Sequence, residues 1–143
     1  MSLPLHLPES TFAIVSIPRA RYGEALAFLA DVEGFVAIMR DNEEVSIVLA
    51  EEAWHSIAAS HTELRVVARV APGWRLIQFD TVLDFSLVGF LAQVSRLLAD
   101  AGISVFTIST YRTDAILVQE SKYPLAVSII ESNKIGTMGE KES

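Results

Sequence analysis

The stretch SLVGFLAQVSRLLADAGISVFTISTYRTDAILVQE, from Ser86 to Glu120, decides the fold. In its first half, apolar residues recur at three- and four-residue steps, which predicts a helix with one buried face: Leu87, Phe90, Leu91, Val94, Leu97, Leu98 and Ala101. Ser86 or Asp84 can cap the start of this helix, and Gly102 can end it. The second half contains two runs that are typical of strands, ISVFTIST and AILVQE.

The segment that joins these two strands, Ser109 to Asp114, consists entirely of side chains able to form hydrogen bonds. An ordinary hairpin turn more often carries Gly, Asn or Pro at its tip. We therefore expect these polar side chains either to hold their own turn together or to bind something.

The rest of the chain extends this pattern in both directions. GWRLIQF, from Gly73 to Phe79, is typical of a strand, and Pro124 stands where the first turn of a final helix tolerates proline. The first half repeats the same order: TFAIVSI as a strand, RYGEALAFLADV as a helix, GFVAIM and EVSIVLA as strands, EEAWHSIAAS as a helix and ELRVVARV as a strand. The sequence thus predicts an α+β fold of two ferredoxin-like βαββαβ units, with antiparallel sheets and helices on one face.

The expected boundaries are 1–70 for the first unit and 71–135 for the second, with a disordered tail at 136–143. The second unit has no final strand of its own. We expect LPLHL, from Leu3 to Leu7, to cross over and supply that strand. In that case neither half folds alone.

Composition excludes several classes of function. The chain of 143 residues has no cysteine, which excludes disulfides and thiolate metal sites. Its net charge is -7 and its basic residues are scattered, so nucleic acid is not an expected partner. No segment has the roughly 20 apolar residues that span a membrane, and the N-terminus does not resemble a signal peptide, so we expect a soluble cytoplasmic protein. A hydrophobic content of 51% suggests a homodimer.

Catalysis has little support in the sequence. The spacing of His6, His55 and His61 matches neither a zinc site nor a nucleophile with its base, and no glycine-rich phosphate loop is present. We therefore expect no enzyme, no metal and no cofactor.

The segment LDFSLVGFLAQVSRLLADAGISVFTISTYRTDAILV, from Leu83 to Val118, resembles the ACT-domain superfamily, and in particular the small tandem-ACT proteins related to cytosolic amino-acid sensors. FAIVSIP, EVSIVLAEEAW and GWRLIQFDTVLDFSL extend the resemblance more weakly over most of the chain. The resemblance implies a ferredoxin-like fold, side-by-side pairing of ACT units, and binding of a free amino acid at an interface between units.

An amino acid is a zwitterion, so its site must offer N–H donors to the carboxylate and acceptors to the ammonium group. The expected carboxylate site is the start of the central helix, at Ser86, Leu87, Val88 and Gly89. Asp114 would accept the ammonium group, and the remaining expected contacts are Ser104, Val105, Thr110, Tyr111 and Thr113.

Each of these residues also has a purely structural interpretation. Asp114 can simply cap its turn, Gly89 can serve close helix packing, and Tyr111 can be a half-buried core residue. Arg112 and Ala115 depart from the family pattern, which leaves the identity of the ligand open.

The leading functional hypothesis is a regulatory module that senses a free amino acid and passes the signal to a protein partner. The alternative is a protein–protein interaction or dimerisation module with no small-molecule ligand. A third hypothesis is an enzyme that uses Asp114 as a base.

Overall fold

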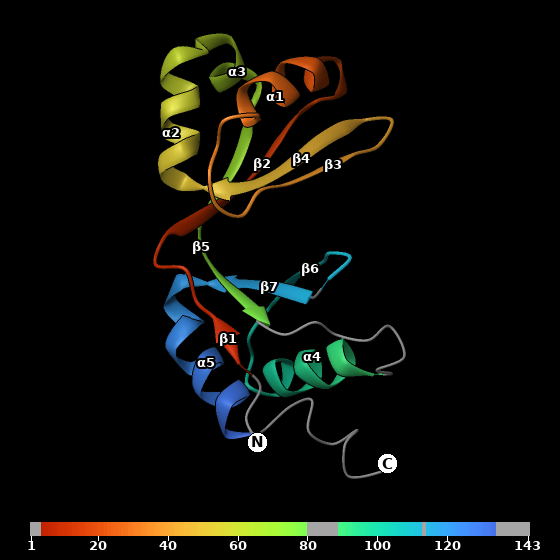
Figure 1. Cartoon of the computed structure of the whole chain (residues 1–143), viewed down its shortest axis with the longest axis vertical. Helices are drawn as coiled ribbons and strands as arrows, with labels where there is room; N and C mark the ends of the chain where they lie inside the picture. The colour runs from red at the N-terminus through yellow and green to blue at the C-terminus, as the bar shows by residue number, and fades with distance from the viewer. Residues whose placement is uncertain (1–3, 80–88, 113, 134–143) are drawn as a thin grey trace. The chain divides into compact units, whose positions relative to one another are not determined.

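The computed structural model describes residues 4–79, 89–112 and 114–133 (Figure 1). The chain divides into two compact units, one formed by Ser10–Trp74 and the other by Met1–Glu9 together with Arg75–Ser143. We call them the N unit and the C unit. The division falls within one strand, β5 (Arg69–Phe79), which therefore contributes its first residues to the N unit and its last residues to the C unit.

The N unit combines four strands with a helical layer. Its strands lie in the order β3-β4-β2-β5, and β2 pairs antiparallel with β4 from Phe12↔Ala50 to Pro18↔Glu44. Along the chain its elements are β2 (Thr11–Pro18), the 3-10 helix η1 (Arg19–Arg21), α1 (Tyr22–Leu29), β3 (Ala37–Arg40), β4 (Glu44–Ala50), α2 (Glu51–Ser60), α3 (Thr62–Val67) and the start of β5.

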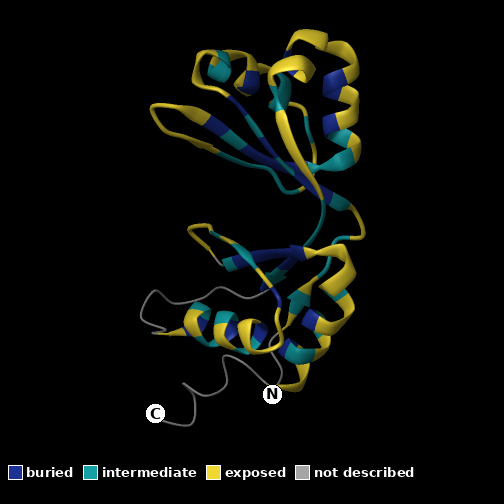
Figure 2. Cartoon of the chain, turned by 180° about the vertical axis from the view of Figure 1, so that it is seen from behind, coloured by how far each residue is buried: buried dark blue, intermediate teal, exposed yellow. Residues whose placement is uncertain are grey.

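The core of the N unit follows from the alternation of strand side chains. Every second residue of β2 and β4 faces the helices, because successive side chains of a strand point to opposite faces. The strand residues of this core are Ala13, Val15, Ile17, Val45, Ile47 and Leu49, and its helix residues are Ala25, Trp54, Ile57, Ala58 and Leu64. Figure 2 shows the buried residues along the strands and on one side of each helix.

The expectation of a strand at ELRVVARV was wrong for most of that segment. Thr62–Val67 forms helix α3, and β5 begins only at Arg69 and continues through Pro72 and Gly73. In a strand, Leu64 and Val66 would share a face, yet Leu64 is fully buried and Val66 is 80% exposed. Burial of Leu64 in the core therefore overrides the strand propensity of the two valines.

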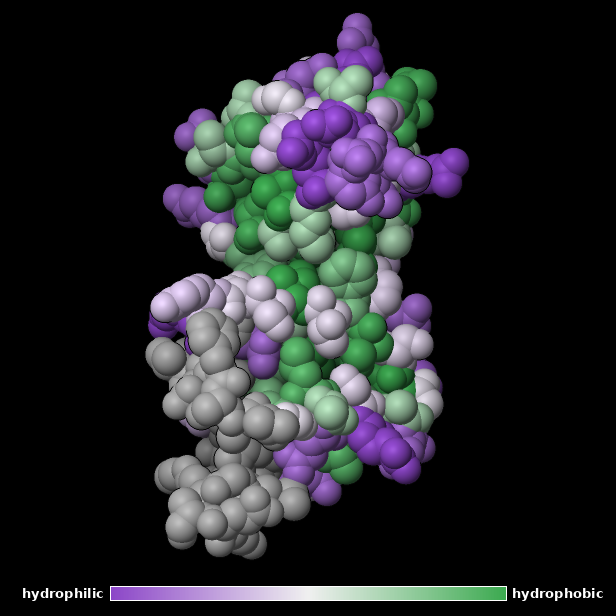
Figure 3. Space-filling view, turned by 90° about the vertical axis from the view of Figure 1, so that its right-hand side faces the viewer, coloured by the Kyte–Doolittle hydropathy of each residue, from purple (hydrophilic) through white to green (hydrophobic). Residues whose placement is uncertain are grey.

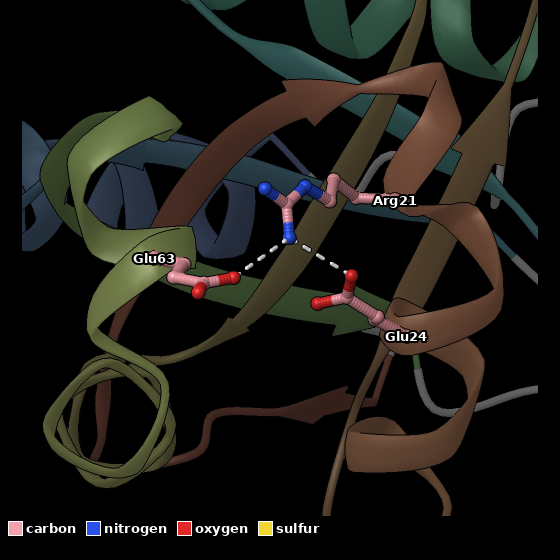
Figure 4. A network of polar contacts seen from close by, with 3 residues as sticks. All are labelled: Arg21, Glu24 and Glu63. Atoms are coloured by element: carbon pink, nitrogen blue, oxygen red, sulfur yellow. Dashed lines mark hydrogen bonds and ion pairs between the residues drawn. The ribbon is translucent and has the colours of Figure 1, made fainter.

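Helix α3 is also tied to the start of α1 by an ion-pair network (Figure 4). Arg21 Nη1 lies 2.9 Å from Glu24 Oε1 and 3.5 Å from Glu63 Oε2. The hydrogen bond to Glu24, followed by the weaker contact with Glu63, raises the pKa of Arg21 above its usual value. Because the network is open to solvent, it adds little to the stability of the unit.

The C unit has the same strand order. Its strands lie in the order β1-β5-β7-β6, which matches β5-β2-β4-β3 of the N unit position by position. Its elements are β1 (Leu5–His6), the end of β5, α4 (Phe90–Asp100), β6 (Phe106–Ser109), β7 (Asp114–Gln119), the 3-10 helix η2 (Glu120–Lys122) and α5 (Tyr123–Ser132), with Pro124 in the first turn of α5. The predicted ferredoxin-like fold, with helices and antiparallel strands, is confirmed.

The fourth strand of the C unit comes from the beginning of the chain. β1 pairs antiparallel with β5, in the register Leu5↔Phe79 and His6↔Gln78. Leu5 and Leu7 pack against the core of this unit, whereas His6 is exposed. Of the segment expected to cross over, Leu3 lies outside the described residues.

Helix α4 supplies one side of the C-unit core. Phe90, Val94 and Leu98 are buried, and the ring of Phe90 meets that of Phe79 edge to face, with centroids 4.9 Å apart. The helix ends in a Schellman motif, since Ile103 N donates to Leu98 O at 2.9 Å and Gly102, at φ 75°, takes the left-handed conformation. Its predicted start at Ser86 and the cap at Asp84 lie outside the described residues.

We predict that a fragment of residues 71–143 does not unfold cooperatively, because it lacks the strand that covers the edge of β5. Fusing residues 4–9 after residue 133 through a Gly/Ser linker of about eight residues restores the βαββαβ order and should restore a cooperative transition. Circular dichroism during heating is the measurement. A cooperative transition in the fragment without residues 4–9 would contradict the prediction.

We also predict a contribution of Asp41 to the acid stability of the N unit. Asp41 Oδ1 accepts hydrogen bonds from Glu44 N at 2.9 Å and Glu43 N at 2.7 Å, which lower the pKa of Asp41 below its ordinary 3.8. A lowered folded-state pKa adds stability above pH 3.8, and this stability is lost as the pH falls through the folded-state value.

The test compares urea midpoints of wild type and Asp41→Ala near neutral pH and below pH 3.8. Asp41→Ala should lower the midpoint near neutral pH and lose less on acidification, whereas Asp31→Ala, at an exposed carboxylate outside this turn, serves as the control. Equal effects of the two substitutions would argue against the turn.

Candidate functional site

The first and last residues of the polar segment Ser109–Asp114 are hydrogen-bonded to each other. Ser109, the last residue of β6, lies opposite Asp114, the first residue of β7. Ser109 Oγ donates to Asp114 Oδ1 at 2.6 Å. Part of the role of these side chains is therefore to close their own hairpin.

Asp114 stands on the face of the sheet that the helices cover. Its neighbours at every second position, Ile116 and Val118, both belong to the C-unit core, and strand alternation puts Asp114 on their side. Thr107 lies opposite Ile116 and so shares this face with Ser109. An otherwise apolar sheet face thus ends in three polar residues, of which Asp114 is half-buried and Thr107 and Ser109 are exposed.

The start of helix α4 is the second part of the site. Gly89 precedes the helix in the left-handed conformation, at φ 82°, and its carbonyl accepts the first helical hydrogen bond from Gln93 N at 2.9 Å. The first N–H groups of a helix have no partners within the helix and carry the positive end of its dipole. Figure 1 draws the start of α4 and the β6–β7 turn toward the same end of the C unit.

The structure describes six of the ten predicted site residues. Gly89 and Asp114 have the positions given above; Ser104 is exposed and Val105 packs against the core. Thr110 and Tyr111 lie in the turn, and Tyr111 is 86% exposed, so it is not a half-buried core residue. The remaining four lie outside the described residues: Ser86, Leu87, Val88 and Thr113.

One polar residue of the C unit, Arg75, was missed at the level of the sequence. Its guanidinium carbon lies 3.9 Å from the centre of the Tyr123 ring, and its Nη2 donates to Pro8 O at 3.0 Å. Among the described residues, Arg75 Nε is a buried nitrogen without a hydrogen-bond partner. The sequence does contain a sign of this role: Arg75 stands two and four residues before Ile77 and Phe79, so a charged residue occupies the strand face that points to the core.

Of the three histidines, His61 has described contacts within the N unit, whereas His6 and His55 are exposed. His61 Nδ1 lies 3.0 Å from Ile57 O, and its ring centroid is 5.7 Å from that of Phe28. Within residues 4–79, 89–112 and 114–133, no group of three potential metal ligands comes together. In the same ranges, no helix has the length and apolar character needed to cross a membrane.

Part of the chain is similar to a known protein family. Residues 69–132 match the profile of the ACT domain, and this range contains the β6–β7 turn, α4 and β5. An ACT domain is found in this chain. It includes all ten residues predicted for the ligand site, since these lie between Ser86 and Asp114.

Solved structures extend the likeness over most of the chain. An Agobacterium tumefaciens protein is 25% identical, with a TM-score of 0.71, over 91% of this chain and 87% of its own. A Vibrio cholerae protein of unknown function is 23% identical, with a TM-score of 0.69, over 92% and 88%. The regulatory subunit of aspartate kinase from Thermus thermophilus, in its ligand-free form, is 12% identical, with a TM-score of 0.66, over 92% and 98%. At 23% and 12% identity, the last two show a shared fold.

We predict that the left-handed residue before α4 makes glycine necessary at that position. Gly89→Ala should lower the free energy of unfolding by about 1–2 kcal/mol, the cost of placing a side chain in this conformation. A Cβ at Gly89 would meet no atom within 4 Å, so the cost comes from the backbone alone.

Gly23→Ala is the matched control. Gly23 also has nothing within 4 Å of a built Cβ, but it lies in helix α1 without a positive φ. This substitution should raise the free energy of unfolding by about 0.4–1 kcal/mol. Urea unfolding measures both changes, and a gain in stability for Gly89→Ala would contradict the assigned conformation.

Proposed function

We propose that this chain is a small cytoplasmic regulatory protein of two tandem ACT-like units, without catalytic activity, that binds a free amino acid and signals through a change of conformation or assembly. The ACT domain at residues 69–132 and the fold shared with a regulatory subunit of aspartate kinase support this class of function.

The observation that carries the proposal is the Asp114 carboxylate at the end of the apolar sheet face. Asp114 is half-buried, and the hydroxyl of Ser109 holds its Oδ1. A carboxylate has four lone-pair sites, so this hydrogen bond leaves acceptor capacity for an ammonium group. A charged hydrogen bond of this kind is stronger in partly buried surroundings than in water.

The carboxylate of the ligand would bind at the start of α4. Helix N-termini bind anions because their free N–H groups and their dipole both favour negative charge. In the proposed site, Asp114 and the α4 start thus hold the two opposite charges of one zwitterion. The full proposed set is Ser86, Leu87, Val88, Gly89, Ser104, Val105, Thr110, Tyr111, Thr113 and Asp114.

A homodimer is part of the proposal. Several large apolar side chains remain exposed among the described residues: Leu26, Met39, Val66, Val67 and Val70 in the N unit, and Leu125 in the C unit. Figure 3 shows hydrophobic surface on both units in one view. Ligand binding would act on a protein partner only if the amino acid has different affinities for two states of the chain.

A second candidate function is a protein–protein interaction module with no small-molecule ligand. Tyr111 favours it, because an aromatic ring that is 86% exposed at a hairpin tip is a common anchor in protein interfaces. In this case the hydrogen bond between Ser109 and Asp114 serves only the shape of the hairpin.

We predict that at least one of the twenty common amino acids stabilises the protein in a thermal-shift screen. A ligand at a hundred times its Kd adds about 2.7 kcal/mol to stability, which for a chain of this size raises Tm by about 5 to 10 °C. Asp114→Asn should abolish this shift, because an amide presents an N–H₂ group toward the ligand ammonium. Calorimetric titration measures the affinity of each hit.

Glu131→Gln is the matched control, since it removes an exposed carboxylate from helix α5 of the same unit. It should leave the shift unchanged. Equal loss in both variants would mean that net charge, not the site, governs binding. A screen without any shift would contradict the amino-acid proposal and favour the interaction module.

A further inference from the structure

The N-terminal strand β1 is held to the C unit by few contacts. It pairs with β5 at only two positions, Leu5↔Phe79 and His6↔Gln78. Leu5 and Leu7 are partly buried against the C-unit core, whereas Pro4 and His6 are exposed. A strand with only two paired residues can open transiently at a lower free-energy cost than global unfolding, and the C unit regains a complete sheet when such a strand pairs again.

Arg75 supplies the one described side-chain hydrogen bond to this segment. Its guanidinium stacks on Tyr123 at 3.9 Å and donates through Nη2 to Pro8 O. The stacking on Tyr123 fixes the plane of the Arg75 guanidinium, so its Nη2 is already oriented to donate to the Pro8 carbonyl. Arg75 Nε nevertheless stays buried without a partner among the described residues, so this anchor is incompletely satisfied.

Departure of β1 would leave a defined acceptor. Gln78 and Phe79 would lose their pairing with β1 at the edge of β5, beside the core surface that Leu5 and Leu7 had covered. Exposed sheet edges of this kind pair readily with another extended segment. The best match to these contacts is the segment that makes them already.

The hinge for such a movement is short. β1 ends at His6 and β2 begins at Thr11, and the division between the two units falls between Glu9 and Ser10. The strand β1 is joined to the N unit by only a few residues without regular structure. Its pairing partners on β5, Gln78 and Phe79, lie far away in the sequence.

We propose that Pro4–Pro8 is an exchangeable strand, and that β1 of one copy occupies the β5 edge in the C unit of a second copy. Each exchanged strand makes the same contacts as in the closed chain, so the two forms differ mainly in the hinge and in the entropy of association. Exchange therefore increases with protein concentration. This inference does not depend on amino-acid binding.

The test uses the absence of native cysteine. His6→Cys and Gln78→Cys are introduced singly, at positions that face each other across β1 and β5. The two variants, one of them labelled with ¹⁵N, are mixed under reducing conditions, incubated and then mildly oxidised. Mass spectrometry measures the disulfide that joins a labelled chain to an unlabelled one.

Two controls frame this measurement. The double variant His6→Cys/Gln78→Cys should form its disulfide within one chain at low concentration, which shows that the geometry permits the bond. Ser128→Cys, at an exposed position of α5, replaces Gln78→Cys to measure random collision.

The expected result is a mixed disulfide several-fold above the Ser128→Cys background that increases with concentration. A mixed disulfide no higher than this background, after incubation up to the onset of thermal unfolding, overturns the proposal.

A second measurement does not require a disulfide. Deleting Glu9 shortens the hinge, which disfavours the closed form and should raise the molar mass seen by light scattering. Inserting Gly-Ser after Glu9 should not raise it. An unchanged mass for the Glu9 deletion, in a chain that remains folded, also counts against exchange.

Discussion

The constraint on which the structure depends is that one strand, β5, belongs to both units. β5 is the last strand of the N unit and the first strand of the C unit. Each unit therefore needs β5 to complete its set of four strands. The C unit takes its missing strand from β1, at the far end of the sequence. The two units are therefore coupled through the chain itself, and residues 1–9 belong structurally with residues that follow position 74.

Most elements of this fold can be predicted from hydrophobic periodicity in the helices and from short apolar runs in the strands, such as the four consecutive buried residues Ala115–Val118 of β7. Helix α4 shows this best, with Phe90, Val94 and Leu98 buried at the expected steps. The prediction failed at Thr62–Val67, where valines favour a strand but the core requires Leu64 on a helix. Strand propensity depends on local sequence, whereas tertiary packing determines the structure of this segment.

The candidate site could be predicted only in part. The polar segment Ser109–Asp114 stands out in the sequence, yet only the register of β6 and β7 shows that its two ends are hydrogen-bonded to each other. The same register puts Asp114 in step with the core residues Ile116 and Val118, at the end of the strand where Thr107 and Ser109 beside it are exposed. Arg75 was missed because its partners, Pro8 and Tyr123, lie far away in the sequence.

The central claim is that a free amino acid binds between the start of α4 and the β6–β7 turn. Amide spectra of the ¹⁵N-labelled protein, recorded with and without each amino acid that stabilises it, test this claim most directly. The account predicts shifts concentrated at Gly89, Ser109, Tyr111 and Asp114, with weaker changes in the N-unit helices. Shifts confined to the N unit, or spread evenly over the surface, would contradict it.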